Sequence, residues 1–368
     1  VTGVQTCALP ILQFDMSFIN NWLRSDIQAI NVYHVPKSKN MVKLDAMESP
    51  FPLSDELTGQ YLAYLADVQL NRYPNPSASS LQQTLRELMG IPAEFGVLLG
   101  NGSDELIQML ALACDANDTI LSIEPSFVMY AMIAKFTRLN YQGVELDENF
   151  EIDLSAILSA VKKYKPKLIF IAYPNNPTGN TFDRDSIISI ITASDALVVL
   201  DEAYYAYAGD SFLNDIAQYP NLVLLRTVSK IGFAGLRLGL LIGAQDTVVE
   251  LDKLRLPYNI NTLTQVSAEF LLQQKDEIDK NAQTIITERS NLSLALEGIK
   301  QLTVYPSQAN FILFKALGAN DLFEALKTKE VLIKNLSSAP RLTDCLRVTV
   351  GTAEENNLFI NIVKEYYD

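Results

Sequence analysis

Short, continuous apolar runs alternate with helical patterns through the middle of the chain. The runs carry few charges, and the segments between them repeat apolar residues at the spacing of helix turns. Strands that are apolar along their whole length are typical of parallel sheets, because both faces of such sheets are covered. The runs are 96–100, 119–123, 167–173, 196–200, 222–225 and 238–243. This alternation predicts an α/β fold with a mainly parallel, doubly wound sheet.

The C-terminal part of the chain has a different pattern. One long helical stretch, Leu263–Ile299, precedes two strand-like segments, Leu302–Leu313 and Leu346–Val350, with a helical segment, Asp321–Lys329, between them. This order predicts a smaller α+β domain, and Pro257–Tyr258 marks the boundary before it. The predicted parts are an N-terminal arm that joins the small domain (16–50), a large domain (51–258) and the small domain (259–368).

The first fifteen residues need separate treatment. Residues 1–11, VTGVQTCALPI, look like the in-frame translation of a sequencing-adapter oligonucleotide, and 12–15 then read as untranslated leader. They lack the basic start and the apolar centre of a signal peptide. We therefore exclude 1–15 from the fold and expect Met16 to be the true start. An amphipathic helix is predicted next, over Ser17–Ala29.

Composition narrows the range of functions. The chain has 368 residues, 48% of them hydrophobic, which is long enough for two domains with separate cores. A net charge of -14 argues against a nucleic-acid or anionic-membrane partner, and no apolar run reaches the length of a membrane span. The three cysteines are not at metal or redox spacing, which favours a reduced, cytoplasmic protein. The one histidine, His34, is predicted to pack in a connector, so we expect neither a histidine-based triad nor a metal centre.

Polar motifs follow the apolar runs, at the edge where open α/β sheets bind ligands. Asn101–Glu105 leads from the first run into a helix, where backbone N–H groups and the helix dipole can bind an anion. Gly102 permits the backbone to approach such a ligand closely. Phe127 follows the second run, and it either stacks on a flat ring or packs in the core. The third and fourth runs end in the polar segments 174–179 and 201–205.

One lysine is central to the candidate chemistry. Lys230 follows the fifth run, Thr227 and Ser229 flank it, and Arg237 comes seven positions later. Hydroxyls and an arginine suit a phosphate, and a lysine beside them suits a Schiff base with pyridoxal phosphate. Taken alone, the same lysine could equally lie on the surface of a strand-to-loop connection.

The remaining motifs supply what pyridoxal chemistry requires. Asp201 can keep the ring nitrogen protonated, since opposite charges about 4 Å apart interact by about 4 kcal/mol at an effective dielectric constant of 20. Asn176 and Tyr204 can share the 3'-oxygen of the ring. All of these motifs are far less likely to occur together in one chain by chance than any one of them is alone. In chain order they are Gly102, Ser103, Phe127, Asn176, Asp201, Tyr204, Lys230 and Arg237.

The same motifs resemble those of a known family. PNNPTG (174–179), LDEAYYAY (200–207), SKIGFAGLRLG (229–239) and CLRVTVGT (345–352) are similar to motifs of the fold-type-I aminotransferases, and the resemblance covers nearly all of 16–368. It implies a homodimeric pyridoxal 5'-phosphate enzyme with a large cofactor-binding domain. The implied reaction transfers an amino group between L-glutamate and imidazole acetol phosphate, giving L-histidinol phosphate and 2-oxoglutarate in histidine biosynthesis.

The resemblance implies a role for each matching residue. Lys230 would form the Schiff base and move a proton between the substrate Cα and the cofactor C4', and Asp201 would bind the pyridine nitrogen. Phe127 would stack on the ring, and Asn176 and Tyr204 would bind its 3'-oxygen. The phosphate would be bound by Gly102, Ser103, Thr227, Ser229 and Arg237, with Tyr73 reaching it from the other subunit. The substrate side would consist of Tyr33, Asn310, Lys334 and Arg347.

Two positions depart from the family pattern. Position 47 is Met where many relatives have Asn, and Lys334 stands where some have Arg, which gives a point charge in place of a planar fork. Both concern the choice of substrate, so an aromatic-amino-acid aminotransferase and a phospho-amino-acid decarboxylase of the same fold are alternatives. A non-catalytic protein that senses the cofactor would need an added DNA-binding domain, and this acidic chain has no spare basic segment for one.

Overall fold

The computed structural model of the chain describes residues 16–30, 32, 36 and 38–368. Contacts divide it into two units, 1–37 and 38–368. In the first unit, the predicted helix over Ser17–Ala29 is two short helices, α1 (Met16–Trp22) and α2 (Ser25–Gln28). They are separate because Arg24 has the extended backbone angles φ −54° and ψ 136°. The predicted leader, 1–15, lies outside the described residues.

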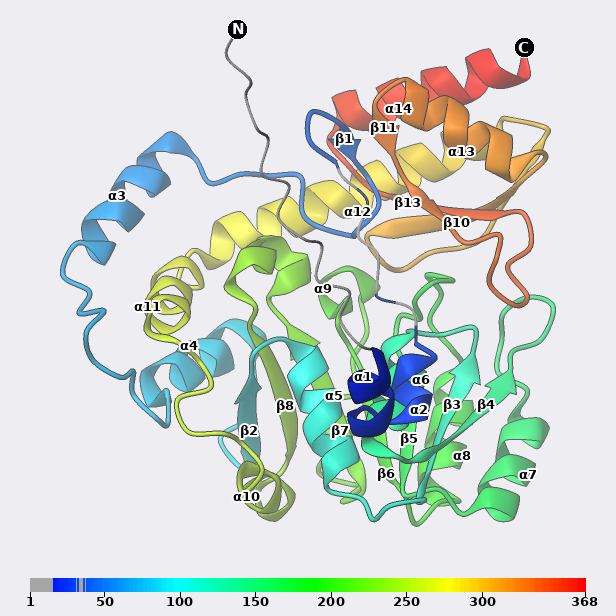
Figure 1. The fold of residues 1–368 in the computed structure, drawn as a ribbon. Coiled ribbons are helices and arrows are strands. Elements are labelled where there is room, and N and C mark those ends of the chain that lie inside the picture. Colours follow the sequence, from blue (N-terminus) through cyan, green and yellow to red (C-terminus); the bar gives the residue numbers. More distant parts are fainter. Residues whose placement is uncertain (1–15, 31, 33–35, 37) are drawn as a thin grey trace, which may run out of the picture. The chain divides into compact units, whose positions relative to one another are not determined.

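A seven-stranded sheet forms the centre of the second unit, in the order β2-β8-β7-β6-β5-β3-β4 (Figure 1). β8 runs antiparallel to both of its neighbours and the other pairs are parallel, so the predicted mainly parallel sheet is confirmed. The strands are β2 (Phe95–Gly100), β3 (Thr119–Glu124), β4 (Asn140–Glu145), β5 (Leu168–Ala172), β6 (Leu197–Asp201), β7 (Leu222–Thr227) and β8 (Gly239–Ala244).

One strand of this sheet was not predicted. β4 has the sequence NYQGVE, which lacks a continuous apolar run, and its residues are half-buried or exposed. It lies at the edge of the sheet and pairs only with β3 among the described strands. An edge strand needs less apolar surface than a central one, and for that reason its sequence carries a weaker strand signal.

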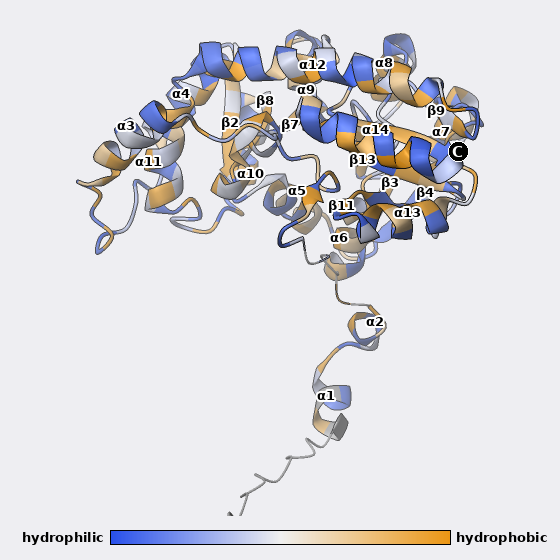
Figure 2. Ribbon diagram, turned by 90° about the horizontal axis from the view of Figure 1, so that it is seen from above, coloured by the Kyte–Doolittle hydropathy of each residue, from blue (hydrophilic) through white to orange (hydrophobic). Residues whose placement is uncertain are grey.

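Helices cover both faces of the sheet, and each face has its own hydrophobic core. One core includes Leu106 of α5 and Tyr130 of α6, and the other includes Leu85 of α4, Ile157 of α7 and Ile187 of α8. Figure 2 shows the buried strands β2 and β8 in hydrophobic orange, whereas the long helix α12 is mainly blue. The helices around the sheet are α3 (Asp55–Leu65), α4 (Ser79–Met89), α5 (Ser103–Leu112), α6 (Met129–Thr137), α7 (Leu154–Tyr164), α8 (Arg184–Thr192), α9 (Tyr205–Ala208) and α10 (Gln245–Asp252).

The C-terminal residues form a smaller antiparallel sheet in the order β12-β13-β10-β9. α13 and α14, orange and red in Figure 1, pack against each other, and α13 also contacts β10 and β13. The elements of this part are α11 (Thr262–Leu271), α12 (Lys275–Glu297), β9 (Leu302–Val304), β10 (Phe311–Ala316), α13 (Ala319–Thr328), β11 (Val331–Leu332), β12 (Lys334–Asn335), β13 (Cys345–Thr349) and α14 (Ala353–Tyr367).

Two of the predicted elements of this part are divided in the structure, whereas the predicted helix Asp321–Lys329 and strand Leu346–Val350 are the single elements α13 and β13. The helical stretch Leu263–Ile299 is the two helices α11 and α12, and the strand-like segment Leu302–Leu313 is a hairpin of β9 and β10. The short strand β1 (Val42–Lys43) pairs in parallel with β11, and Leu44 and Met47 pack in the same core as Phe311 and Phe314. These contacts support the proposal that the arm joins the small domain, and the exact boundaries stay a prediction. In the described part of the chain, no helix is both long and apolar enough to span a membrane.

Candidate active site

A cavity lies at the carboxyl ends of the central strands. Its walls are formed by Met47, Ser103, Asp104, Phe127, Ala172, Asn176, Asp201, Ala203, Tyr204, Thr227, Ser229, Lys230 and Arg237. Most of these residues lie at or just after the ends of β2, β3, β5, β6 and β7, which are distant in sequence and belong to one sheet, and Met47 comes from the segment after β1. The structure therefore brings together nine of the residues singled out from the sequence, and Gly102 is the immediate neighbour of Ser103.

Lys230 lies in a tight turn, Ser229–Phe233, directly after β7. Gly232 has φ 117° in this turn, a conformation that residues with a side chain rarely adopt. The Lys230 Nζ donates a hydrogen bond to the Ala46 carbonyl oxygen at 3.1 Å, and the Tyr207 hydroxyl donates to the Lys230 carbonyl. Desolvation, with a further contribution from Arg347, lowers the pKa of Lys230 from its usual 10.5 to about 8. About a tenth of this amine is therefore neutral, and hence nucleophilic, at pH 7, far more than for an ordinary lysine.

Asp201 is the last residue of β6, and its carboxylate is 5% exposed. Its Oδ2 accepts a hydrogen bond from the Tyr130 hydroxyl at 2.8 Å, and its Oδ1 accepts one from the Ala203 amide at 3.1 Å. Burial raises the pKa of Asp201 to about 6, and these two donors act in the opposite direction. The carboxylate is thus oriented in the cavity and remains mostly ionised at neutral pH.

Tyr130 was not identified from the sequence. It is fully buried, stacks on Phe170 with ring centroids 4.7 Å apart, and meets Phe127 edge to face at 5.5 Å. Phe127 lies just before α6 and Tyr130 lies in its first turn, where the Tyr130 amide donates to the Phe127 carbonyl at 3.1 Å. Two aromatic residues three positions apart are the local sequence signal for this pair. Tyr130 links the predicted stacking residue to the predicted carboxylate.

The turn between β2 and α5 forms an anion site together with Arg237. Gly102 precedes α5 with φ 82°, and a Cβ there would lie 2.6 Å from the Arg237 Nη2. A Cβ on Gly239 would lie 2.5 Å from the Ser103 amide, so both glycines are required by close packing. The half-exposed Arg237 guanidinium reaches Asp104 at 3.4 Å. The N-terminus of a ten-residue helix and an arginine therefore converge on one point.

Two further hydroxyls, those of Thr227 and Ser229, line the same cavity. The Thr227 hydroxyl donates to the Leu238 carbonyl at 3.0 Å and shares a 2.9 Å hydrogen bond with the Ser229 hydroxyl. The Ser229 amide donates to the Thr227 hydroxyl at 3.1 Å. This short network fixes the backbone immediately before Lys230.

Asn176 connects the cavity to Arg347. The Asn176 Nδ2 donates a hydrogen bond to the Tyr204 hydroxyl at 3.4 Å. The Asn176 Oδ1 accepts a hydrogen bond from the Arg347 Nη1. Arg347 lies on β13, is 6% exposed, and donates from Nη2 to the Asp45 carbonyl at 3.0 Å. Lys334 is the cross-strand partner of Arg347 in register, and its side chain is half-buried.

Met47 lines the cavity in a left-handed conformation, φ 55°. Its amide donates to the Thr349 hydroxyl at 3.0 Å, and its carbonyl accepts from the Asn310 Nδ2 at 3.0 Å. Asn is among the residues that adopt this conformation most readily, and Met is not. Asn310 itself is fully buried and does not form the cavity wall, so the structure places it behind Met47.

Besides Gly102, four described residues of the predicted site do not form the cavity wall, namely Tyr73, Asn310, Lys334 and Arg347. Tyr73 is 81% exposed and stacks on Tyr258, with ring centroids 4.4 Å apart. Tyr33 lies outside the described residues, and so does His34.

Comparison with known proteins adds to this geometry. A family model for aminotransferase class I and II matches residues 39–363. The chain is 69% identical over 352 residues to a histidinol-phosphate aminotransferase of Vesicomyosocius okutanii, covering 96% of this chain and 99% of the relative. It is 48% identical over 350 residues to a protein of Nitrosococcus oceani named histidinol-phosphate aminotransferase 2, covering 94% and 97%.

Solved structures share the fold. A histidinol-phosphate aminotransferase from Sinorhizobium meliloti, in complex with pyridoxal-5'-phosphate, has a TM-score of 0.82 at 21% identity and covers 94% of this chain and 98% of that one. A histidinol-phosphate aminotransferase from Clostridium acetobutylicum has a TM-score of 0.81 at 23% identity, covering 89% and 99%. At these identities the similarity concerns the fold alone.

Proposed function

Because this chain belongs to the class I and II aminotransferases, we propose that it transfers an amino group between L-glutamate and imidazole acetol phosphate, giving L-histidinol phosphate and 2-oxoglutarate. The observation that carries this proposal is the 69% identity to a histidinol-phosphate aminotransferase over 96% of the chain. The family expected from the motifs is thereby confirmed. The reaction is a step of histidine biosynthesis, and the cofactor is pyridoxal 5'-phosphate.

The donors of the cavity fit this cofactor. When bound, pyridoxal phosphate supplies a carbonyl that condenses with amines and a ring that accepts electrons. The buried carboxylate of Asp201 suits a protonated ring nitrogen, and the anion site at the start of α5 suits a phosphate. The residues assigned to the phosphate are Gly102, Ser103, Thr227, Ser229 and Arg237, those assigned to the ring oxygen are Asn176 and Tyr204, and Phe127 is assigned to the ring face.

Lys230 is assigned the covalent link and the proton transfer. Its lowered pKa leaves an amine that can attack a carbonyl near neutral pH and can later take the proton from the substrate Cα and return one. Asp201 holds the proton on the ring nitrogen because its ionised carboxylate, fixed by Tyr130, is the counter-charge. Asp201 is buried, so water screens its charge interactions less than it would at the surface.

The substrate side is assigned to Arg347, Lys334, Asn310 and Tyr33. Glutamate carries a carboxylate and histidinol phosphate carries a phosphate, so one cationic fork must accept both anions, and Arg347 suits this purpose. Its Nη1 already reaches Asn176 at the cavity wall. Asn310 acts through Met47, whose carbonyl it holds, and is therefore a positioning residue for the cavity wall.

We further propose a homodimer in which Tyr73 serves the phosphate site of the other subunit. The support is the exposure of Tyr73 together with its stacking on Tyr258, which presents a rigid aromatic pair at the surface. Mixing Tyr73→Phe subunits with Lys230→Ala subunits tests it. Activity above that of both parents is expected, since one site of each mixed dimer is then intact. No recovery with verified subunit exchange would show that Tyr73 serves its own chain.

Substrate choice is the part of the proposal to test first. The purified enzyme should turn over histidinol phosphate with a higher kcat/KM than phenylalanine or tyrosine, and it should need 2-oxoglutarate as acceptor. A preference for phenylalanine would favour the aromatic aminotransferase. Release of carbon dioxide from a phosphorylated amino acid without an acceptor would favour the decarboxylase.

A further inference from the structure

Three polar residues form a row on the face of the central sheet opposite the cavity. Ala172 of β5 pairs in register with Asp201 of β6, and Asp201 pairs with Leu225 of β7. The next residue on each strand is Tyr173, Glu202 and Arg226, respectively. Side chains alternate between the faces of a sheet, and since Ala172 and Asp201 line the cavity, this row points away from it. The membership of Tyr173 in the core of the opposite face agrees with this orientation.

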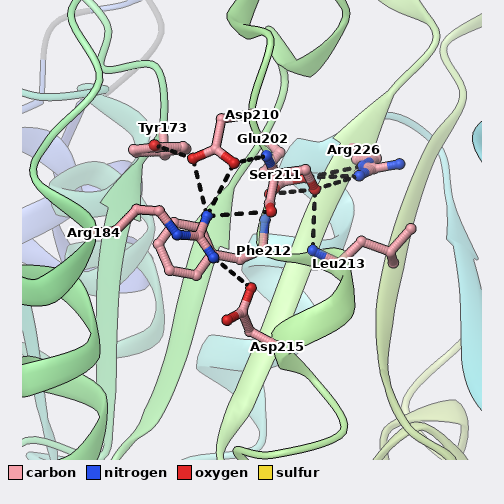
Figure 3. A network of polar contacts seen from close by, with 9 residues as sticks. All are labelled: Tyr173, Arg184, Glu202, Asp210, Ser211, Phe212, Leu213, Asp215 and Arg226. Carbon is pink, nitrogen blue, oxygen red and sulfur yellow. Dashed lines mark hydrogen bonds and ion pairs between the residues drawn. The ribbon is translucent and has the colours of Figure 1, made fainter.

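One loop segment binds all three residues of the row (Figure 3). The Tyr173 hydroxyl donates to the Asp210 Oδ2 at 2.8 Å. The Ser211 hydroxyl lies 2.9 Å from both oxygens of Glu202, and the Phe212 amide donates to the Glu202 Oε1 at 2.7 Å. The Arg226 Nη2 lies 2.8 Å from the same Ser211 hydroxyl. The segment 210–212 therefore joins the ends of β5, β6 and β7 from behind.

The centre of this arrangement is a buried ion pair. Glu202 is 0% exposed and Arg226 is 2% exposed. The Arg226 Nε and Nη2 donate to the Glu202 Oε2 at 3.0 Å and 2.9 Å. The guanidinium also lies 4.3 Å from the centre of the Tyr205 ring. Desolvation cancels much of the attraction of a buried pair, so such a pair is weak evidence for stability, and its best-attested use is to fix one arrangement among several.

We infer that this ion pair fixes the distances between the three cavity loops that follow β5, β6 and β7. Tyr173 comes three residues before Asn176, Glu202 directly follows Asp201, and Arg226 directly precedes Thr227. A shift of one strand end against another would move the carboxylate relative to Lys230. Misplacement of reacting groups by about 1 Å can cost about a hundredfold in rate.

We propose that Glu202, Arg226, Ser211 and Tyr173 are positioning residues that set the distance between the Asp201 carboxylate and the Thr227–Lys230 turn from behind the sheet. They touch neither cofactor nor substrate. This inference rests on the roles proposed above for Asp201 and Lys230. It predicts that changes in the row weaken cofactor binding more than a substitution in the neighbouring core does at the same loss of thermal stability.

The test compares three variants by cofactor dissociation constant and melting temperature. Ser211→Ala removes the hydroxyl that joins Glu202 to Arg226, and Glu202→Gln removes the charge of the pair. Val198→Ala is the matched control, because Val198 is fully buried on the same strand and the same face as Glu202, four residues earlier. Pyridoxal phosphate is titrated into each cofactor-free protein, and the absorbance of the bound cofactor is followed across pH.

Ser211→Ala and Glu202→Gln should raise the dissociation constant of the cofactor about tenfold and shift the pH midpoint of its absorbance. Val198→Ala should lower the melting temperature with less than about a twofold change in that constant. If Ser211→Ala binds the cofactor like the control at equal loss of melting temperature, the positioning role is wrong. Lys230→Ala serves as a separate reference. If it leaves the absorbance of the bound cofactor unchanged, the proposed function fails, whatever the row variants do.

Discussion

Asp201 and Glu202 are consecutive carboxylates, and the sheet sends them to opposite faces. Glu202 accepts hydrogen bonds from four donor groups among the described residues, which are the Ser211 hydroxyl, the Phe212 amide and the Nε and Nη2 of Arg226. Asp201 accepts two, from Tyr130 and Ala203. A carboxylate has about four lone-pair sites, so those of Glu202 are filled whereas Asp201 retains acceptor capacity in the cavity.

By this difference, Glu202 is a carboxylate that stabilises the structure, whereas Asp201 is a carboxylate that can still bind a ligand. Filling every acceptor of a buried carboxylate compensates for its desolvation and fixes the elements around it. Leaving acceptors open costs stability unless a ligand completes them, and the raised pKa of Asp201, about 6, reflects this cost. The two neighbours should therefore respond in opposite ways to the removal of charge.

The largest expected effect on activity is that of Asp201→Asn. The amide keeps the shape of the side chain but removes the counter-charge, whose interaction with the ring nitrogen is worth about 4 kcal/mol, so kcat should fall about a thousandfold. The melting temperature should change little or rise, because a neutral amide is easier to bury than a carboxylate. Steady-state kinetics and calorimetry on one preparation check both parts. A kcat within tenfold of the original would remove Asp201 from the chemistry.

On the opposite face of the sheet, the main expected effect of Arg226→Met is a lower free energy of unfolding. It leaves the buried Glu202 without its charged partner, and because Ser211 and Phe212 still donate to that carboxylate, we expect a loss at the low end for such pairs, about 3 kcal/mol. The double variant Glu202→Gln with Arg226→Met should recover part of the loss. Urea unfolding measures both. An unchanged free energy of unfolding in the single variant would mean that the pair does not hold these strands.

The smallest effect is expected from Tyr130→Phe. The hydroxyl donates to the ionised carboxylate, which lowers the pKa of Asp201, so its removal should raise that pKa further above its usual value. The ionised fraction of Asp201 then falls at a given pH, and the acidic limb of the kcat/KM profile should move to higher pH. Cofactor binding at pH 7 should weaken about tenfold, as expected for one hydrogen bond to a charged group. An acidic limb at the same pH would show that this hydroxyl does not tune Asp201.

The cavity face was largely predictable from the sequence, and the opposite face was not. Asp201 and Lys230 follow apolar runs in motifs that only a ligand site explains, so their positions at the strand ends were evident. Glu202 lies in the same motif as Asp201, and Arg226 lies three residues before the motif of Lys230, yet their partner Ser211 comes from a loop whose path depends on tertiary packing. The sequence did contain one signal for this pair, a charged residue at the end of each of two buried strands. Buried charges require partners, so two such residues of opposite sign indicate an ion pair.

Tyr130 shows a second limit of prediction from the sequence. Its helix, MYAMIAKFT, has the pattern of an ordinary core helix, and only the register of α6 against β6 brings the hydroxyl to Asp201. Sequence spacing relates residues within one element, whereas this contact joins two elements across 71 positions. The same reason explains why Asn310 was assigned to substrate contact from the family resemblance, while its amide donates to the Met47 carbonyl in the structure.

The most direct test of the account is the chemical mapping of the lysine that binds the cofactor. The enzyme loaded with pyridoxal phosphate is reduced with borohydride, digested, and its labelled peptide sequenced. The account predicts a single labelled peptide that contains Lys230, because this amine lies in the cavity with Asp201 and has a pKa of about 8. A labelled peptide that lacks Lys230 would contradict the assignment of this cavity as the cofactor site.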